Sequence, residues 1–287
     1  MSGTLYLVGT PIGNLGDLSP RAQETLHKVD FIAAEDTRVT IKLLNHFEIK
    51  KPMISYYAHN RRQRGVEILA RLRGGESCAL VTDAGMPAVS DPGEELVTLC
   101  AEAEIEIICV PGPSAFVTAL SLSGLPTGRF TFEGFLSTAA KSRRDHLKSL
   151  TQERRTMVFY EAPHKIAQTL NDMLNTWGDR RIAISRELTK RYEETIRTTL
   201  AQAVVRYAED GEKPRGEFVL IIEGAPPPTP MEEAADLNAA LVLLQAMTAD
   251  GTSLKDAARQ IAADTGIARN VLYTEALKMR GDGENDC

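Results

Sequence analysis

Residue types that ligate metals or form covalent links are scarce in this chain. Only 4 of its 287 residues are cysteine and 5 are histidine. Neither type occurs at a spacing typical of metal ligands, of a redox pair or of a disulfide framework. We therefore expect no metal centre. We interpret Cys78, Cys100 and Cys109 as small buried apolar residues and Cys287 as a free thiol in the tail.

Long apolar runs are also absent. No apolar stretch approaches the roughly 18 residues that a transmembrane helix needs. The first residues, MSGTLYL, carry neither the basic lead nor the apolar segment of a secretory signal. We therefore expect a soluble, cytoplasmic protein without membrane association.

An excess of positive charge is lacking too, because the formal net charge is −6. A protein coated in nucleic acid needs lysine and arginine to neutralise phosphates, so only a local basic patch could hold RNA here. Two stretches qualify, although either could be an ordinary solvated helix face. The first contains Arg61, Arg62, Arg64, Arg71 and Arg73, and the second contains Lys141, Arg143, Arg144, Lys148, Arg154 and Arg155.

Up to about Gly224, short apolar runs alternate with helical patterns, which predicts parallel strands joined by crossover helices. We expect strands at 5–8, 31–34, 53–56, 78–82, 105–110, 130–133, 156–160, 181–185 and 217–222. We expect helices at 20–29, where Ser19 caps and Pro20 is first, from Asp91-Pro92 to 103, and at 164–175. The pattern predicts one α/β domain over residues 1–117 and another over 118–224.

The remaining residues differ in composition. Residues 225–230, APPPTP, are typical of a stiff extended linker. In the tail, residues 231–287, Ser253-Leu254-Lys255-Asp256 matches a capping box ahead of a helix. A second helix follows the turn at Thr265-Gly266 and runs to about Met279. Two helices around a glycine turn outline a helix-turn-helix, which serves either plain packing or nucleic-acid reading.

Loops rich in glycine and proline follow several expected strands of the first domain, where α/β sheets collect their reactive sites. They are GTPIGNL at 9–15, EDTR at 35–38, DAGMP at 83–87 and PGPSA at 111–115. The spacing matches neither known phosphate-binding loop, which disfavours a nucleotide-phosphate site. We interpret the loops as rigid backbone that closely approaches a flat adenine or ribose. A tight turn would explain any single loop.

Together with strings farther along the chain, these loops resemble the tetrapyrrole-methylase superfamily of S-adenosylmethionine enzymes. The strings are TPIGNLGDLSPRA, AAEDTR, DAGMPAVSDPG, PGPSA, FEGFL, FYEAPHK, RELTK and GEFVLIIEG, in that order over residues 10–224. Within the superfamily, the chain looks like the branch that methylates the 2′-oxygen of a cytidine in 16S rRNA, and its helical tail fits that branch.

The resemblance implies two αβα domains, a small C-terminal helical segment, and a homodimer whose methyl donor lies in each interdomain cleft. In that arrangement Asp83 accepts hydrogen bonds from the donor, and backbone at Met86 and Ser114 holds its amino-acid part. At Met86 the resemblance leads us to expect a smaller residue such as threonine. By analogy, the donor contacts Pro11, Asp83, Ala84, Met86, Ser114, Ala115, Tyr160, Leu188, Glu217 and Phe218.

Methyl transfer to a 2′-hydroxyl depends on positioning and on removal of the hydroxyl proton by a carboxylate or lysine. As catalytic residues we expect Asp36, Arg38, Glu161, Glu187 and Lys190, with Glu35 as a further candidate base. The same residues could instead form an ion-pair network that braces the domain interface. We expect RNA to bind a flexible basic loop near the cleft mouth that contains Lys141, Arg143 and Arg144. We also expect Arg186 and Arg38 to contact RNA phosphates.

Two other functions remain open at this point. One is methylation of a small tetrapyrrole, because an enzyme for that substrate would have the same kind of donor site as an RNA methyltransferase. The other is a non-catalytic helix-turn-helix binding protein whose α/β domains only sense a small ligand. The basic stretch, the linker and the tail favour RNA, and the successive loop motifs favour an enzyme.

Overall fold

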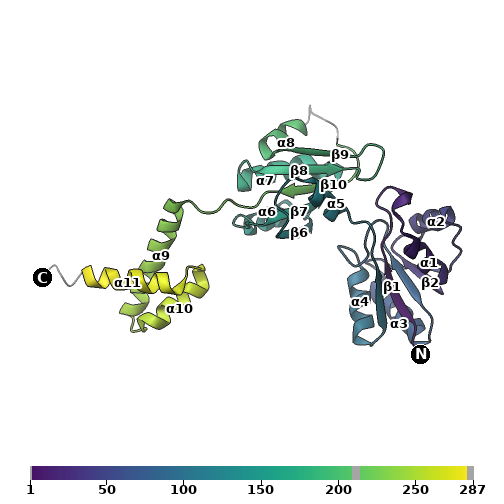
Figure 1. Ribbon diagram of the computed structural model, residues 1–287, viewed down its shortest axis with the longest axis horizontal. Coiled ribbons are helices and arrows are strands. Elements are labelled where there is room, and N and C mark those ends of the chain that lie inside the picture. The colour runs from purple at the N-terminus through teal and green to yellow at the C-terminus, as the bar shows by residue number, and fades with distance from the viewer. Residues whose placement is uncertain (1, 209–213, 283–287) are drawn as a thin grey trace. The chain divides into compact units, whose positions relative to one another are not determined.

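A computed structural model describes residues 2–208 and 214–282 (Figure 1). The chain forms two compact units, Met1–Ala225 and Pro226–Cys287. The first unit contains two sheets with their helices, and the second contains helices alone.

The first sheet is fully parallel, as predicted, with the order β3-β2-β4-β1-β5. Its strands are β1 (Thr4–Val8), β2 (Phe31–Ala34), β3 (Met53–Ser55), β4 (Cys78–Val81) and β5 (Glu106–Val110). Every residue of β2 and β4 is buried, which is typical of parallel strands covered on both faces.

Four helices cover the two faces of this sheet (Figure 1). They are α1 (Pro20–Lys28), α2 (Thr37–His46), α3 (Arg61–Arg73) and α4 (Gly93–Glu102), and a short 3-10 helix, η1 (Leu15–Asp17), precedes α1. Leu26 and Leu44 anchor α1 and α2 on one face, while Ile68 and Leu96 anchor α3 and α4 on the other. The predicted cap is confirmed, because the Ser19 hydroxyl accepts the N–H of Ala22 at 3.1 Å.

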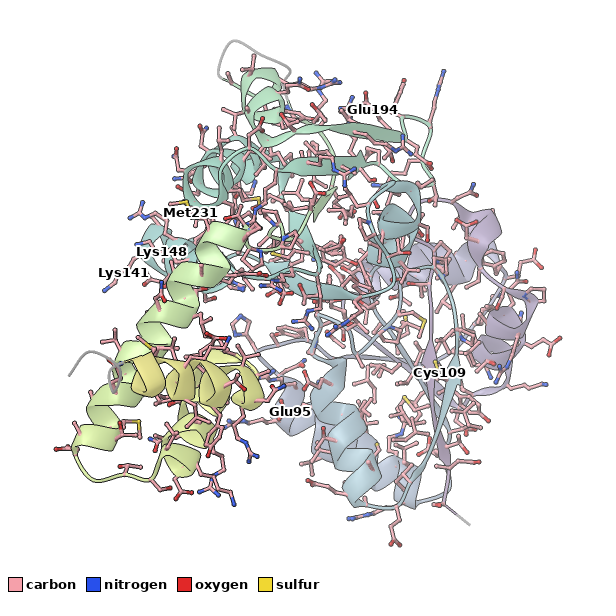
Figure 2. All side chains as sticks on the ribbon, turned by 60° about the vertical axis from the view of Figure 1, so that its left-hand side comes forward. Glu95, Cys109, Lys141, Lys148, Glu194 and Met231 are labelled. Carbon is pink, nitrogen blue, oxygen red and sulfur yellow. The ribbon has the colours of Figure 1, made fainter. Side chains whose placement is uncertain are left out.

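The edge position of β5 corrects one expectation. Cys78 and Cys100 are buried as predicted, but Cys109 on β5 is exposed. Figure 2 shows Cys109 on this strand. An edge strand has a neighbour on one side only, so its side chains are less covered than those of β2 or β4. Cys287 lies outside the described residues.

The second sheet is mixed, so the prediction of parallel strands is wrong for this half. Its order is β6-β7-β10-β8-β9, and only β6 and β7 pair in parallel. The strands are β6 (Phe130–Phe135), β7 (Thr156–Glu161), β8 (Arg181–Arg186), β9 (Glu194–Thr199) and β10 (Phe218–Ile222). The connection at 187–193 is too short for a crossover helix, so β8 is followed by an antiparallel neighbour. We did not predict β9, whose sequence ETIRTT contains no apolar run.

Helices cover both faces of the second sheet as well. They are α5 (Ala115–Leu122), α6 (Ala140–Ser149), α7 (Ile166–Trp177) and α8 (Leu200–Arg206), with a 3-10 turn, η2 (Pro163–Lys165), before α7. Residues of α6, α7 and α8 share one core, and Ala119 and Leu120 of α5 share the other with β7, β8 and β10. The division that we predicted at residue 117 falls within α5.

The second unit is a bundle of α9 (Pro230–Ala249), α10 (Leu254–Thr265) and α11 (Arg269–Asp282). Its core contains Leu244, Ile261 and Leu272, one from each helix. The Ser253 half of the predicted capping box is confirmed, because its hydroxyl accepts the N–H of Asp256 at 3.1 Å, whereas the Asp256 carboxylate accepts the Ser253 hydroxyl at 2.6 Å and not a backbone N–H. Gly266, with φ +75, ends α10. The predicted helix pair therefore exists and α9 packs against it. None of the described helices is long and apolar enough to cross a membrane.

Candidate functional site

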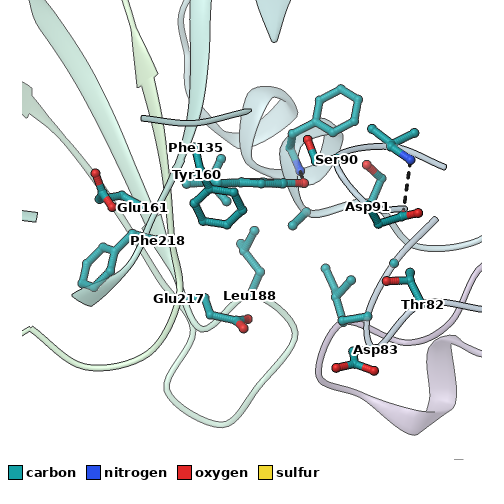
Figure 3. Close-up of a pocket in the computed structure, with 18 of the residues that line it drawn as sticks. Thr82, Asp83, Ser90, Asp91, Phe135, Tyr160, Glu161, Leu188, Glu217 and Phe218 are labelled. Atoms are coloured by element: carbon teal, nitrogen blue, oxygen red, sulfur yellow. Dashed lines mark hydrogen bonds between the residues drawn. The ribbon is translucent and has the colours of Figure 1, made fainter. Parts of the chain in front are cut away.

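A cavity of about 480 Å³ lies in the first unit, where loops of the first sheet face the second sheet (Figure 3). The first domain contributes Ile12, Glu35, residues 82–86 and 89–91 after β4, and residues 114–116 at the start of α5. The second domain contributes Phe135, residues 160–163 and 187–188, Lys190 and residues 217–219. This volume falls within the range of about 300–1,000 Å³ that is typical of small-molecule sites.

Close backbone contacts hold the loops of the first domain together. A Cβ on Gly9 would lie 2.6 Å from the Cα of Gly112, so both positions must be glycine for the loops after β1 and β5 to meet. Thr10 and Gly85 exchange backbone hydrogen bonds of 2.9 and 3.1 Å, which join the loops after β1 and β4. The loops are thus the closely packed backbone that the glycine and proline pattern predicts.

Met86 takes part in this packing. Its sulfur accepts the N–H of Gly112 at 3.2 Å, and a Cβ on Gly9 would lie 2.7 Å from the same sulfur. The thioether therefore fills the space between the three loops, and a weak sulfur hydrogen bond takes the place of the hydroxyl that a threonine would bring.

Carboxylates dominate the first-domain side of the cavity. Asp83 accepts the backbone N–H of Asp36 at 3.0 Å, and Glu35 accepts the Thr82 hydroxyl at 2.6 Å. Burial raises the pKa of the Asp83 carboxyl, and the nearby charges of Glu35 and Asp36 add to this effect. Burial likewise raises the pKa of Asp91, although backbone N–H groups of Gly93, Ala88 and Val89 oppose it. This side of the cavity favours a bound cation, which would relieve the repulsion.

The opposite side contains a smaller charged group. Lys190 Nζ lies 2.8 Å from Glu187 Oε1 and 3.9 Å from a Glu217 oxygen. A Cβ on Gly13 would lie 2.5 Å from Lys190 Cγ, so the loop after β1 packs directly on this lysine. Glu187 and Thr189 have φ values of 50 and 65, a left-handed conformation that costs energy in residues other than glycine. Such backbone strain gathers at functional sites.

Glu161 lines the cavity, yet its carboxylate is engaged elsewhere. The residue is 2 % exposed, and its two oxygens accept the N–H of Ala162 at 2.8 Å and the Thr169 hydroxyl at 2.6 Å. Figure 3 shows its carboxylate on the far side of the strand from the cavity. In this arrangement Glu161 joins β7 to α7, and it holds no carboxylate oxygen toward a reacting group.

Asp36 and Arg38 lie beside the cavity and are absent from its lining. Asp36 caps α2 by accepting the N–H of Arg38 at 2.8 Å, and it binds the Arg38 guanidinium at 2.6 Å. The hydrogen bonds from Arg38 lower the pKa of Asp36 to about 2. A carboxylate that weakly basic is a poor proton acceptor, so the predicted base role of Asp36 has no support in this geometry. Pro11 also lies outside the lining.

The predicted donor contacts otherwise come together at this cavity. Nine of the ten residues named from the resemblance line it: Asp83, Ala84, Met86, Ser114, Ala115, Tyr160, Leu188, Glu217 and Phe218. Glu35, Glu187 and Lys190 join them. Their roles stay predictions, because no ligand marks them. We did not single out Phe135, Ser90 or Phe116, although Phe135 lies in the quoted string FEGFL.

The predicted RNA residues divide into exposed and buried groups. The segment with Lys141, Arg143 and Arg144 is helix α6, so the prediction of a flexible loop is wrong. Arg143 is 3 % exposed and pairs with Asp172 at 2.7 Å. It is therefore a structural residue, and its predicted RNA contact is wrong. Lys141 and Arg144 are exposed, and Figure 2 shows Lys141 and Lys148 projecting from α6. Arg186 pairs with Glu194 at 2.6 Å.

A metal was not expected from the sequence, and the described residues contain no group of three or more histidine, cysteine, aspartate or glutamate side chains placed to hold one. Two carboxylates of the cavity, Asp83 and Glu35, are bonded to neighbouring protein groups.

Comparison with known proteins gives a family and several relatives. A family model described as Tetrapyrrole (Corrin/Porphyrin) Methylases matches residues 4–204. A protein of Synechocystis sp. called "Ribosomal RNA small subunit methyltransferase I" is 50% identical over 285 residues, which cover 98% of this chain and 100% of the relative. A protein of the same name from Xylella fastidiosa is 47% identical, and the match covers 94% of this chain and 98% of the relative. Another from Pseudomonas aeruginosa is 43% identical, and the match covers 98% of this chain and 99% of the relative.

Solved structures show the same fold at lower identity. Uroporphyrin-III-C-methyltransferase from Thermus thermophilus superposes with a TM-score of 0.55 at 19% identity and covers 77% of this chain and 94% of that chain. A diphthine synthase superposes with a TM-score of 0.58 at 15% identity and covers 81% of this chain and 94% of that chain. At these identities the likeness supports the fold alone.

Proposed function

The chain belongs to the tetrapyrrole (corrin/porphyrin) methylase family, and we propose that it transfers a methyl group from S-adenosylmethionine to the ribose 2′-hydroxyl of a cytidine in 16S rRNA. The observation that carries this proposal is the full-length match to proteins named as ribosomal RNA methyltransferases. The family model ends at residue 204, whereas the Synechocystis relative covers 98% of this chain, helical tail included. This match favours RNA over a small tetrapyrrole.

The charge of the cavity suits the proposed donor. Apart from Glu161, whose carboxylate is engaged elsewhere, five carboxylate residues and one lysine stand among the described residues that line it: Glu35, Asp83, Asp91, Glu187, Glu217 and Lys190. S-adenosylmethionine supplies an electrophilic methyl group on a cationic sulfonium and also carries an ammonium group. An acidic, partly enclosed wall attracts both cations more strongly than bulk water does. In the proposed site Asp83 binds one of the polar groups of the donor.

Among the predicted bases, Glu35 and Glu187 both line the cavity, and we propose Glu187 because Glu35 already accepts the Thr82 hydroxyl at 2.6 Å. Lys190 holds one of the Glu187 carboxylate oxygens at 2.8 Å. The Glu161 carboxylate is hydrogen-bonded to Thr169 instead of facing the cavity. The pKa of Asp36 is lowered to about 2, which makes it a weak base. In the proposed reaction Glu187 accepts the hydroxyl proton while Lys190 fixes its position. Rate enhancement then comes chiefly from the alignment of the oxygen with the methyl carbon.

We further propose that the protein acts as a homodimer in the cytoplasm, on 16S rRNA or the small ribosomal subunit, as the family resemblance implies. The test of the function is mass mapping of 2′-O-methyl groups in 16S rRNA from cells with and without this protein. One cytidine should lose its mark when the protein is absent. An unchanged map, together with methylation of a tetrapyrrole by the purified protein, would overturn the proposal. Donor binding without any turnover would support the ligand-sensing alternative.

A further inference from the structure

Phe135 combines two properties that the donor site does not explain. It is a large apolar side chain that is 60 % exposed, and it lines the acidic cavity. It stands at the end of β6, an edge strand of the second sheet. It is not among the residues that the family resemblance places against the donor. An aromatic ring that faces solvent at the rim of a polar cavity favours a ligand that enters from outside.

The local backbone directs this ring toward the cavity. The pairing of β6 with β7 shifts register between Phe132 and Gly134, and Gly134 has φ +63. A β-bulge of this kind redirects the side chains that follow it. A Cβ on Gly134 would lie 3.5 Å from Ser90 Oγ, so the bulge lies against the loop after β4, whose residues also line the cavity.

A packed aromatic group supports Phe135 from behind. Its ring centroid lies 5.3 Å from that of Tyr160. Figure 3 shows the two side chains next to each other. The Tyr160 hydroxyl accepts the N–H of Phe116 at 3.3 Å. The ring centroid of Phe132 lies 5.1 Å from that of Tyr160 and 4.6 Å from that of Phe116. Tyr160 is thus fixed in orientation, and the Phe135 ring has a rigid aromatic neighbour tilted by 53° to it. A preorganised ring loses little entropy when a second ring stacks on it.

The charge of the cavity selects what that ring can bind. The carboxylates that attract a cationic donor repel the phosphates of an RNA strand. A nucleotide that enters must therefore offer its uncharged parts to this wall, namely the base and the ribose. Base–aromatic stacking is the common way in which proteins hold an unpaired base.

We propose that Phe135 is the platform on which the base of the target nucleotide stacks, so that its ribose reaches the methyl group in the cavity. This inference rests on the proposed function. Phe135 is then a substrate-positioning residue that contacts the acceptor and leaves the donor to the interior of the cavity. The target nucleotide must be unpaired or turned out of its helix to reach it.

The test compares Phe135→Leu, Phe135→Trp and the matched control Phe130→Leu. Phe130 stands on the same strand and is 39 % exposed, but it does not line the cavity. Transfer of labelled methyl to small ribosomal subunits that lack the mark is measured, with donor affinity followed by calorimetry. Loss of one base stack predicts a rise in the subunit KM of roughly 5- to 150-fold for Phe135→Leu. Donor affinity should stay unchanged, and Phe135→Trp and Phe130→Leu should resemble the unaltered protein.

The tryptophan variant gives a second readout that does not depend on turnover. The chain contains one tryptophan, Trp177, which is 9 % exposed. In Phe135→Trp, an unpaired RNA oligonucleotide should quench the added indole fluorescence, and the donor alone should not.

Either of two results would overturn the inference. One is an unchanged subunit KM in Phe135→Leu. The other is weakened donor binding in that variant, which would place the adenine of the donor on this ring. Failure of the unaltered protein to methylate the subunits would instead count against the proposed function.

Discussion

The carboxylate of Asp83 accepts the backbone N–H of Asp36 across 3.0 Å, so the loop after β4 is tied to the start of α2. This bond places the Asp83 carboxylate at the wall of the cavity, between Thr82 and Ala84, which also line it. Burial raises the pKa of Asp83, and the charges of the two nearby acidic residues, Glu35 and Asp36, add to this effect. The site therefore holds a negative charge that a bound cation would stabilise.

The first prediction concerns Asp83→Asn. The amide oxygen can still accept the N–H of Asp36, so the fold should be kept while the charge is lost. Hydrogen bonds to charged groups contribute about 1.5–3 kcal/mol, which predicts roughly ten- to 150-fold weaker binding of S-adenosylmethionine. Calorimetric titration measures the affinity, and thermal unfolding serves as the control for the fold. An unchanged dissociation constant would remove Asp83 from the donor site.

The pH dependence of donor binding gives the same prediction a second readout. Because the pKa of Asp83 is raised above its ordinary value of 3.8, the carboxyl takes up a proton sooner as the pH falls than an exposed aspartate does. Donor affinity should therefore be full near neutral pH and decline through the acid range. Asp83→Asn should show a flatter profile over the same range. Parallel profiles for the two proteins would contradict the assignment.

The second prediction concerns the buried pair of Arg143 and Asp172. Their side chains are 4% and 15% exposed. Arg143→Ala leaves the Asp172 carboxylate covered and without its cation, which costs about 3–5 kcal/mol of unfolding free energy. Urea denaturation measures this loss, and Arg144→Ala on the exposed face of α6 is the control. Equal stability of the two variants would show that Asp172 finds another partner or water.

The third prediction concerns the exposed cations of α6. If Lys141 and Arg144 contact RNA phosphates, replacing both by alanine removes two contacts from RNA binding. Each contact contributes roughly 0.7 to 0.9 to the slope of log affinity against log salt, so the slope should flatten by about one to two units. The Asp83→Asn variant, which leaves α6 intact, is the control. A slope equal to that of the unaltered protein would place the RNA on another surface, such as α3.

The fourth prediction concerns the C-terminal unit. Lys255, Arg269 and Tyr273 line one depression on it, which combines cations with a ring that can stack on a base. Loss of a tethered second binding module weakens affinity by roughly 100-fold or more. Removing residues 226–287 should therefore weaken RNA binding to that extent and leave donor binding as it was. Filter binding and calorimetry measure the two affinities. Equal RNA affinity would make the bundle a purely structural addition.

Much of the first domain could be predicted because its strands are short apolar runs, two of which, β2 and β4, are wholly buried. Phe31–Ala34 has no polar residue, and Ser19-Pro20 marks the start of α1 by two independent preferences. The loops that line the cavity could be found because they follow such strands and carry glycine and proline. These signals are local, so one sequence contains them.

Strand direction and side-chain burial in the second domain depend on contacts that are distant in sequence. The β9 strand, ETIRTT, lies at a sheet edge and consists almost entirely of polar residues, so it lacks the apolar run that marks a strand in the sequence. Its antiparallel pairing with β8 follows from the short connection between the two strands. Arg143 and Arg144 differ by about 100° around α6. Arg143 shares its face with Leu147, four residues on, and that spacing was the available signal of burial. The exposed ring of Phe135 depends on the bulge at Gly134, and the glycine within a strand pattern was the available signal of that bulge.

The most direct test of the proposed function is the transfer of labelled methyl from S-adenosylmethionine to small ribosomal subunits by the purified protein, followed by nuclease digestion and mass analysis of the nucleosides. The account predicts label in a single 2′-O-methylcytidine for the unaltered protein, and a strongly reduced yield for Asp83→Asn at the same donor concentration. Label on a base, label in a tetrapyrrole alone, or an equal yield from Asp83→Asn would contradict it.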